Sequence, residues 1–156
     1  MNADDDGFYD SQKPSYETQG ASLRARFITG SDGRFSFRTI LPCSYPVPTD
    51  GPVGQLLAAT SRHAMRPAHV HFLVNASGYQ PLITHVFMDG DKYLDSDVVF
   101  GVKDELVAKI EKRTDAKMPD GKPAAAPWHL MTYEFRMKPG AGEAPKPMAS
   151  KAKEDA

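Results

Sequence analysis

The stretch Arg66-Pro-Ala-His-Val-His-Phe72 places two histidines one residue apart in an apolar run. Side chains alternate along a β-strand, so His69 and His71 would point to one side and Val70 to the other. Their Cα atoms would lie roughly 6.5 Å apart, which lets both imidazoles reach a single ion. A metal-binding pair and a pair of hydrogen-bonded core histidines both fit this stretch, so the rest of the chain has to decide.

Composition limits the kind of protein this chain forms. Its 156 residues are enough for one domain with a hydrophobic core. Its net charge of −1 gives no surplus of basic residues for binding nucleic acid. Cys43 is the single cysteine, so no internal disulfide framework is possible and a reducing compartment is favoured. No apolar run is long enough to span a membrane, and the N-terminus lacks the apolar region of a signal peptide. We therefore expect a cytoplasmic domain with neither a membrane nor a nucleic acid as partner.

The pattern of short alternating runs, separated by proline and glycine, predicts an all-β layout. The expected strands are Leu23–Ile28, Arg34–Arg38, Ala68–Val74, Leu82–Met88 and Trp128–Met137, the first two joined by a turn at Gly30–Gly33. A short helical turn is expected at Gly54–Thr60. Apolar residues at helical spacing predict one short helix over Asp104–Arg113. Residues 138–156 lack aromatic residues and are expected to form a disordered tail.

Two tyrosines are candidates to join the histidines. Tyr45 lies in Ser44-Tyr-Pro-Val-Pro48, where the prolines stiffen the backbone and can pre-position a phenol. Tyr9, in Gly7-Phe-Tyr-Asp10, has weaker local support. For either residue, a ring that simply packs and forms a local hydrogen bond remains an alternative.

If one ion took both imidazoles and both phenols, the donor set would narrow the choice of metal. Tyrosine has a pKa near 10, so only a strong Lewis acid removes its proton at neutral pH. Zinc prefers cysteine, histidine and carboxylate ligands, and ferrous oxygenases favour two histidines and one carboxylate. Two phenolates instead suit a hard trivalent ion, and ferric iron fits.

Two further side chains could act on a bound substrate. Arg66, three residues before His69, could stabilise negative charge that develops on a substrate ring, although a surface salt bridge is the usual role of an arginine. His85 lies on the strand expected to pair with that of His71, and could orient an intermediate or be an ordinary core histidine. His63 and His129 belong to no motif.

At these residues the sequence resembles the intradiol ring-cleavage dioxygenases, ferric enzymes that open catechols between the two hydroxyls. The motifs that carry the resemblance are Gly7-Phe-Tyr9, Tyr45-Pro-Val-Pro48, Asp50-Gly-Pro-Val-Gly54, Arg66–Phe72, Gly78-Tyr79 and Gly90-Asp-Lys-Tyr-Leu94. They occur in family order with family-like spacing, from Asp4 to about Phe135. The resemblance implies a β-sandwich of mixed and antiparallel strands, with one short helix and long loops, in a catalytic domain over residues 1–137.

The same resemblance implies roles for individual residues. Tyr9, Tyr45, His69 and His71 would be the ligands of Fe³⁺, and Arg66 would be the catalytic arginine. A diol substrate would bind as a dianion and displace Tyr45, the released phenolate would accept a diol proton, and His85 would assist Arg66.

Three stretches, Asp4–Asp10, Leu41–Tyr45 and Thr84–Phe87, resemble those of hydroxyquinol 1,2-dioxygenases, whereas catechol enzymes typically carry glutamine where His85 stands. The expected substrates are therefore dioxygen and benzene-1,2,4-triol, with catechol as the alternative. The expected product is of the cis,cis-muconate type.

The chain also departs from the family pattern. The resemblance implies a helical segment before Tyr9, through which relatives form homodimers, and early strands of the sandwich; neither is present. We therefore expect an N-terminally truncated domain. One alternative is an inactive truncated β-domain or interaction module. Another is a cupin-like metalloprotein, which is disfavoured because no further carboxylate and third histidine stand at the spacing that cupins use.

Overall fold

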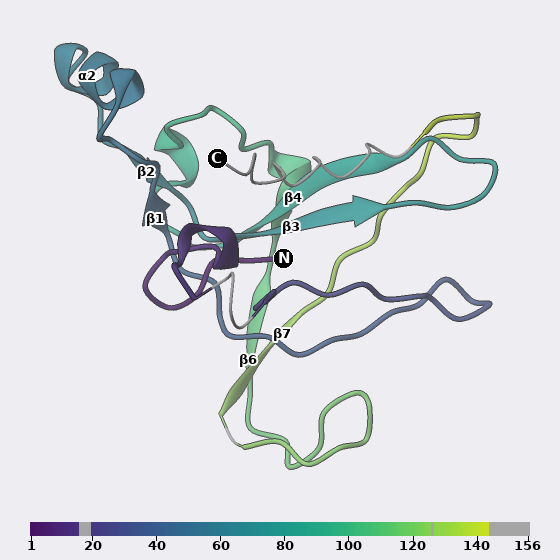
Figure 1. The fold of residues 1–156 in the computed structure, drawn as a ribbon. Helices are drawn as coiled ribbons and strands as arrows, with labels where there is room; N and C mark the ends of the chain where they lie inside the picture. Colours follow the sequence, from purple (N-terminus) through teal and green to yellow (C-terminus); the bar gives the residue numbers. More distant parts are fainter. Residues whose placement is uncertain (16–19, 126, 144–156) are drawn as a thin grey trace, which may run out of the picture.

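The architecture is built from short paired strands and long irregular connections (Figure 1), and the computed structural model describes residues 1–15, 20–125 and 127–143. Three small sheets pair β1 with β2, β3 with β4 and β5, and β6 with β7. The strands are β1 (Tyr45–Pro46), β2 (Met65–Arg66), β3 (His69–Val74), β4 (Leu82–Met88), β5 (Val107–Ala108), β6 (Ile110–Arg113) and β7 (Trp128–Met131). In the described residues one α-helix, α2 (Pro52–Ala59), and three 3-10 turns, η1 (Asp10–Gln12), η2 (Leu94–Ser96) and η3 (Asp104–Leu106), complete the fold.

The antiparallel pair of β3 and β4 is the framework of the molecule. His69 lies opposite Phe87 and His71 lies opposite His85, so all four side chains share one face of the pair. The strand and its antiparallel partner were both predicted from the sequence, and both are confirmed. The alternation in His-Val-His therefore separates a histidine-bearing face from an apolar face.

The opposite face of the β3–β4 pair forms the core. Val70 and Met88 are buried on it together with Ala68, the residue before β3. Four partly buried apolar side chains, one from β3 itself and three from distant parts of the chain, pack against these three: Phe72, Phe37, Ile110 and Met131. Burial of this apolar face supplies the hydrophobic free energy that holds the histidine-bearing face in place.

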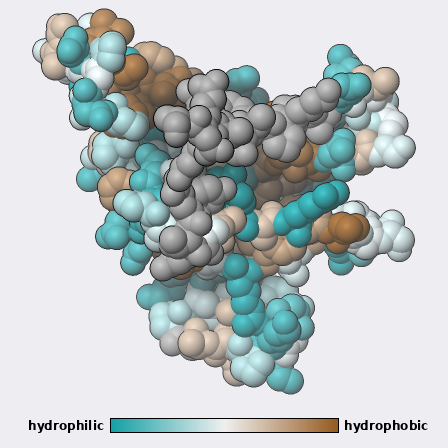
Figure 2. Space-filling view, viewed as in Figure 1, coloured by the Kyte–Doolittle hydropathy of each residue, from teal (hydrophilic) through white to brown (hydrophobic). Residues whose placement is uncertain are grey.

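Residues 21–41 form an extended arm that runs beside the β3–β4 hairpin (Figure 1). The predicted turn is confirmed, because the backbone N–H groups of Gly30 and Gly33 donate to the carbonyls of Arg34 and Gly30. The predicted strands on either side of it are wrong: the structure assigns no strand to 21–41. Stacked rings rather than a ladder join the two halves, with Phe27 and Phe37 centred 5.2 Å apart. Figure 2 shows hydrophobic surface gathered between this arm and the hairpin.

The predicted helix over Asp104–Arg113 is also wrong. Only Asp104–Leu106 is helical, as η3, and the chain then enters β5 and β6. Val107 and Ala108 pair in parallel with Phe87 and Met88. Pairing with an already buried strand outweighs the weak helical preference of a short segment.

Helix α2 projects away from the sheets (Figure 1). Its start uses Gly51 as the N-cap and Pro52 at the first helical position, where a missing N–H costs nothing. Gly54 is required at its position because a Cβ there would lie 1.9 Å from the carbonyl oxygen of Thr49. The helical turn predicted here is confirmed.

The C-terminal strand is shorter than predicted. The structure ends β7 at Met131, whereas the alternating pattern extends to Met137. Beyond it, the carbonyl of Lys138 accepts from Gln80 N, and Gly140 N donates to the carbonyl of Gly78. A disordered tail was expected over residues 138–156, and its part from residue 144 onward lies outside the described residues.

Candidate metal centre

His69 is the central residue of the site and is only 1% exposed. Its Nδ1–H donates to the carbonyl oxygen of Pro67 over 2.7 Å, which fixes the tautomer and leaves a lone pair on Nε2. His71 Nε2 lies 3.2 Å from that atom. The two histidines of the strand therefore converge on one point, as their spacing predicts.

Both predicted tyrosines reach the same point. Tyr9 Oη lies 2.9 Å from Tyr45 Oη, and the two phenol oxygens lie 3.3 Å and 3.2 Å from His69 Nε2. Tyr45 comes from β1, where it is paired with Arg66 of β2. Tyr9 comes from the N-terminal turn, sixty residues before His69. Residues from three separate parts of the chain thus place oxygen and nitrogen donors together.

The turn that carries Tyr9 is held by its own polar side chains. Tyr9 N–H donates to Gln12 Oε1 over 2.8 Å, and the buried carboxylate of Asp10 accepts from Arg24 through two nitrogens at 2.7 and 3.0 Å. Asp4 accepts from Phe8 N and pairs with Lys13. The turn is therefore rigidly connected to the start of the 21–41 arm.

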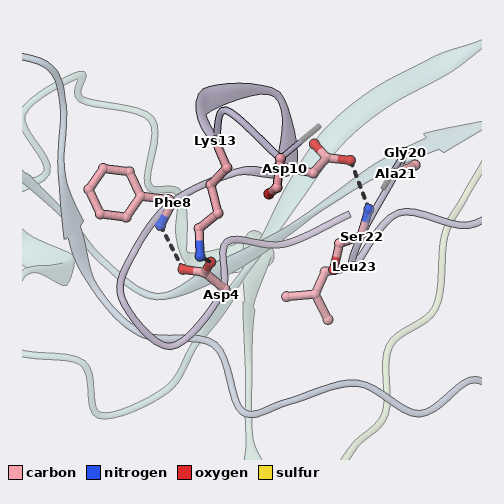
Figure 3. Close-up of a pocket in the computed structure, with 9 residues that line it drawn as sticks. Asp4, Phe8, Asp10, Lys13, Gly20, Ala21, Ser22 and Leu23 are labelled. Atoms are coloured by element: carbon pink, nitrogen blue, oxygen red, sulfur yellow. Dashed lines mark hydrogen bonds and ion pairs between the residues drawn. The ribbon is translucent and has the colours of Figure 1, made fainter. Parts of the chain in front are cut away.

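A pocket opens beside this turn (Figure 3), lined in part by Asp4, Asp10 and Lys13. Its two carboxylates are already used: Asp4 by Lys13, and Asp10 by Ser22 N–H and Arg24. These hydrogen bonds and ion pairs stabilise the Tyr9 turn.

Gly7 sets the distance between the N-terminal turn and β1. It has φ +86°, a left-handed conformation that side chains disfavour, and a Cβ on it would lie 2.7 Å from Tyr45 Cβ. Glycine here lets the Tyr9 turn approach Tyr45 closely enough for their hydroxyls to meet.

The donor set fits a small metal ion. Donor atoms bound tetrahedrally to one ion at about 2.1 Å lie about 3.4 Å apart, close to the separations found here. Two imidazoles and two phenols, with no carboxylate among the four, match ferric iron better than zinc or ferrous iron. The four residues therefore form a centre that could hold Fe³⁺.

The protonation states of the donors depend on burial. Burial, with nearby positive charge, lowers the pKa of His69 to about 4 and of His71 to about 3, so both are neutral and able to bind a metal at neutral pH. Burial and the hydrogen bond with Tyr45 raise the pKa of Tyr9 well above its usual value. Only a strong Lewis acid would ionise that phenol, in keeping with a trivalent ion.

Arg66 reaches the same atoms and is itself buried. Its Nη1 donates to His69 Nε2 over 3.2 Å, while Nε and Nη2 donate to the carboxylate of Asp97 over 3.2 and 3.4 Å. The sequence left open that Arg66 forms a salt bridge at the surface, but its ion pair with Asp97 is buried. Asp97 was missed in the sequence analysis, because nothing in Leu94-Asp-Ser-Asp97 distinguishes it from the neighbouring Asp95.

His85 is brought beside the histidine pair. Its ring centroid lies 4.5 Å from that of His71 and 5.3 Å from that of His69, and no hydrogen bond from its ring is recorded among the described residues. Burial lowers its pKa. Of the two histidines without a motif, His63 packs against Tyr93 and His129 is exposed on β7.

Comparison with known proteins assigns this chain to a family. A family model described as "Dioxygenase" matches residues 1–139. Hydroxyquinol 1,2-dioxygenase of Nocardioides simplex is 46% identical over 138 residues, which are 88% of this chain and 46% of that protein. The chain belongs to the intradiol dioxygenase family. The sequence-based assignment is therefore confirmed at the level of the family.

Two other members of the intradiol dioxygenase family show how far the similarity extends. The 6-chlorohydroxyquinol 1,2-dioxygenase of Cupriavidus pinatubonensis is 55% identical over 113 residues, 72% of this chain and 40% of that protein. The crystal structure of hydroxyquinol 1,2-dioxygenase from Pseudomonas putida DLL-E4 matches with a TM-score of 0.81 and 44% identity, covering 90% of this chain and 49% of that one. The chain spans about half the length of these relatives.

No helix in the described part of the chain is long and apolar enough to cross a bilayer.

Proposed function

We propose that this protein holds Fe³⁺ through Tyr9, Tyr45, His69 and His71 and opens an aromatic diol between its two hydroxylated carbons. The observation that carries this proposal is the meeting of two phenol oxygens and a histidine nitrogen within 2.9–3.3 Å, with the second histidine 3.2 Å away. A ferric ion held there would supply the Lewis acidity that ionises the diol and makes its ring reactive toward dioxygen.

In this proposal Tyr45 is the proton acceptor for the incoming diol. It lies on a stiff segment, paired with β2 on one side and followed by Pro46 and Pro48, so the backbone would hold its phenol oxygen within reach of a hydroxyl of a diol bound at the same point. Tyr9, whose backbone N–H donates to Gln12 Oε1, would remain as the permanent phenolate.

Arg66 and His85 would act on the organic ring. The guanidinium points at the shared donor atoms, so its positive charge can stabilise negative charge that develops on the substrate carbon. His85 sits on the same sheet face and, being neutral through burial, can donate or accept one hydrogen bond with a ring substituent.

The substrate we propose is hydroxyquinol (benzene-1,2,4-triol), with a cis,cis-muconate-type product. The support comes from relatives at 46–55% identity whose names specify hydroxyquinol or 6-chlorohydroxyquinol. Catechol is the second choice, because a catechol 1,2-dioxygenase of Candida albicans is 42% identical over 106 residues. We further propose that residues 1–137 belong to a β-sandwich catalytic domain of the kind this family resemblance implies.

The test combines iron content, visible absorption and product formation on one sample. Ferric phenolate complexes absorb visible light, so the protein loaded anaerobically with ferrous iron and reoxidised should be coloured and should cleave hydroxyquinol faster than catechol. Tyr45→Phe should weaken the colour and abolish turnover. Tyr79→Phe, at an exposed ring away from the centre, should change neither.

Three results would each contradict a part of the proposal. Protein that stays colourless and binds no iron after loading would favour an inactive β-domain derived from this family. Full activity of Tyr45→Phe would remove that residue from the site, and faster cleavage of catechol would overturn the choice of substrate.

A further inference from the structure

Asp97 is a buried carboxylate that no predicted role explains. Its residue is 3% exposed and follows η2, far in sequence from every candidate ligand. Its oxygens accept from two nitrogens of Arg66, from Gly101 N over 2.9 Å and from Val99 N over 3.4 Å. A buried ionised group with this many donors is fixed in one position, because any movement would leave a charge without a partner.

The guanidinium nitrogens of Arg66 contact two different side chains. Nε and Nη2 face Asp97, and the remaining terminal nitrogen, Nη1, lies 3.2 Å from His69 Nε2. A planar guanidinium held along one edge by a carboxylate can no longer rotate, so the direction of its free edge is decided by that carboxylate. Val98 N–H also donates to the carbonyl of Met65, which ties the Asp97 loop to β2 beside Arg66.

We propose that Asp97 is the positioning residue of this centre: it aims the guanidinium of Arg66 at the metal-binding atoms and balances its charge there. The catalytic part of this inference rests on the proposed function, whereas the pairing of Asp97 with Arg66 rests on the geometry alone. An arginine close to a trivalent ion is repelled by it, and a buried carboxylate on the far edge of the guanidinium offsets that repulsion. Among the described residues, Asp97 forms no hydrogen bond with the four candidate ligands, and its side-chain contact toward the centre is with Arg66.

Gly101 supplies the space for this pair. A Cβ on it would lie 3.1 Å from Asp97 Oδ2 and 3.2 Å from Arg66 Nη2, tighter than ordinary contact. Its φ is not in the left-handed region, so alanine is tolerated by the backbone there. Gly101→Ala therefore perturbs the pair without removing a charge or changing the candidate ligands.

The experiment compares Asp97→Asn, Gly101→Ala and a control on the iron-loaded 156-residue chain. Asp97→Asn keeps the shape of the side chain but loses its charge, and we expect kcat for hydroxyquinol to fall about 10- to 100-fold, as for partners that orient groups at metal sites. The visible phenolate band and the iron content should be retained, because no candidate ligand changes. Gly101→Ala should lower kcat less, and Asp120→Asn, which removes an ion pair with Arg38 in a distant loop, should leave kcat unchanged.

A double-mutant cycle separates positioning from general stabilisation. If Asp97 acts through Arg66, adding Asp97→Asn to Arg66→Lys should lower kcat little beyond Arg66→Lys alone. Losses that multiply in the double variant would overturn the inference, and so would Asp97→Asn that works as well as the wild type.

A measurement without turnover tests the pairing itself. In a nitrogen–proton NMR spectrum, the Arg66 Nε–H signal, identified by its loss in Arg66→Lys, should exchange slowly in the wild type and rapidly in Asp97→Asn. A rapidly exchanging Nε–H in the wild type would overturn the pairing. A protected Nε–H in a wild type that neither binds iron nor cleaves hydroxyquinol would instead refute the proposed function, and with it the catalytic part of this inference.

Discussion

The two ends of the β3–β4 hairpin differ sharply although they share the same strands. At the base, His69, Val70, Val86 and Phe87 are at most 2% exposed. Near the tip, Leu73 and Ile83, which are paired with each other, are 55% and 61% exposed. All of these positions follow the same alternation of side chains, and the base is buried because β1, β2, β5 and the N-terminal turn meet there.

This difference indicates why the candidate site lies at the base of the hairpin. A side chain becomes a fixed ligand or a fixed charge only where other segments exclude water and occupy its remaining hydrogen-bonding positions. Substitutions at the base should therefore change metal binding or stability strongly, and substitutions at the tip should change little.

The largest effect is expected for His69→Ala at the base. It removes the atom that Tyr9, Tyr45, His71 and Arg66 all approach, so we expect bound iron and the visible band to be lost. Iron analysis after loading and desalting measures this. His129→Ala, an exposed histidine of β7, is the matched control and should retain iron. Retention of stoichiometric iron by His69→Ala would show that the centre lies elsewhere.

Acid should destabilise the metal-free protein through the base histidines. Unfolded histidine has a pKa near 6.5, and burial lowers that of His69 to about 4 and that of His71 to about 3. The unfolded state then binds more protons, so the free energy of unfolding should fall as the pH drops from about 6.5 toward 4. His71→Gln should flatten this dependence in denaturant titrations. His129→Gln should not, and an equal effect of both would contradict the assignment.

Val86→Ala tests the apolar side of the base. The side chain is fully buried, so its truncation should lower the free energy of unfolding by about 2 kcal/mol. Ile83→Ala, on the same strand near the tip, should cost less than about 0.5 kcal/mol. Urea titration of both variants makes the comparison, and equal losses would mean that the tip is covered in solution.

Gly7→Ala examines the close approach between the N-terminal turn and β1. The left-handed conformation alone costs a residue with a Cβ about 1–2 kcal/mol, and the 2.7 Å contact with Tyr45 should add to that. Gly33→Ala, at φ +73° with no atom within 4 Å of its Cβ, measures the conformational cost alone. If the two variants lose equal stability, the contact with Tyr45 is relieved by a small shift.

Local patterns were sufficient where one strand or one turn carries the information. The alternation through His69 and His71 predicts both the strand and its histidine-bearing face, and the turn before Leu82–Met88 predicts the antiparallel partner. The same reasoning failed for Asp104–Arg113, because parallel pairing of Val107 with Phe87 decided its conformation. It also failed for 23–28 and 34–38, where ring stacking takes the place of a backbone ladder.

What the sequence determined by itself is the set of candidate donors and the family: two imidazoles at strand spacing, a tyrosine followed by two prolines, and motifs that resemble those of the family. What only the tertiary structure decided is their convergence on His69 Nε2 and the choice of Asp97, rather than Asp95, as the partner of Arg66. The reason is physical. Residue type and alternation are local properties of the chain, whereas burial of a charge and the meeting of atoms from positions 9, 45, 69 and 97 depend on how distant segments pack together.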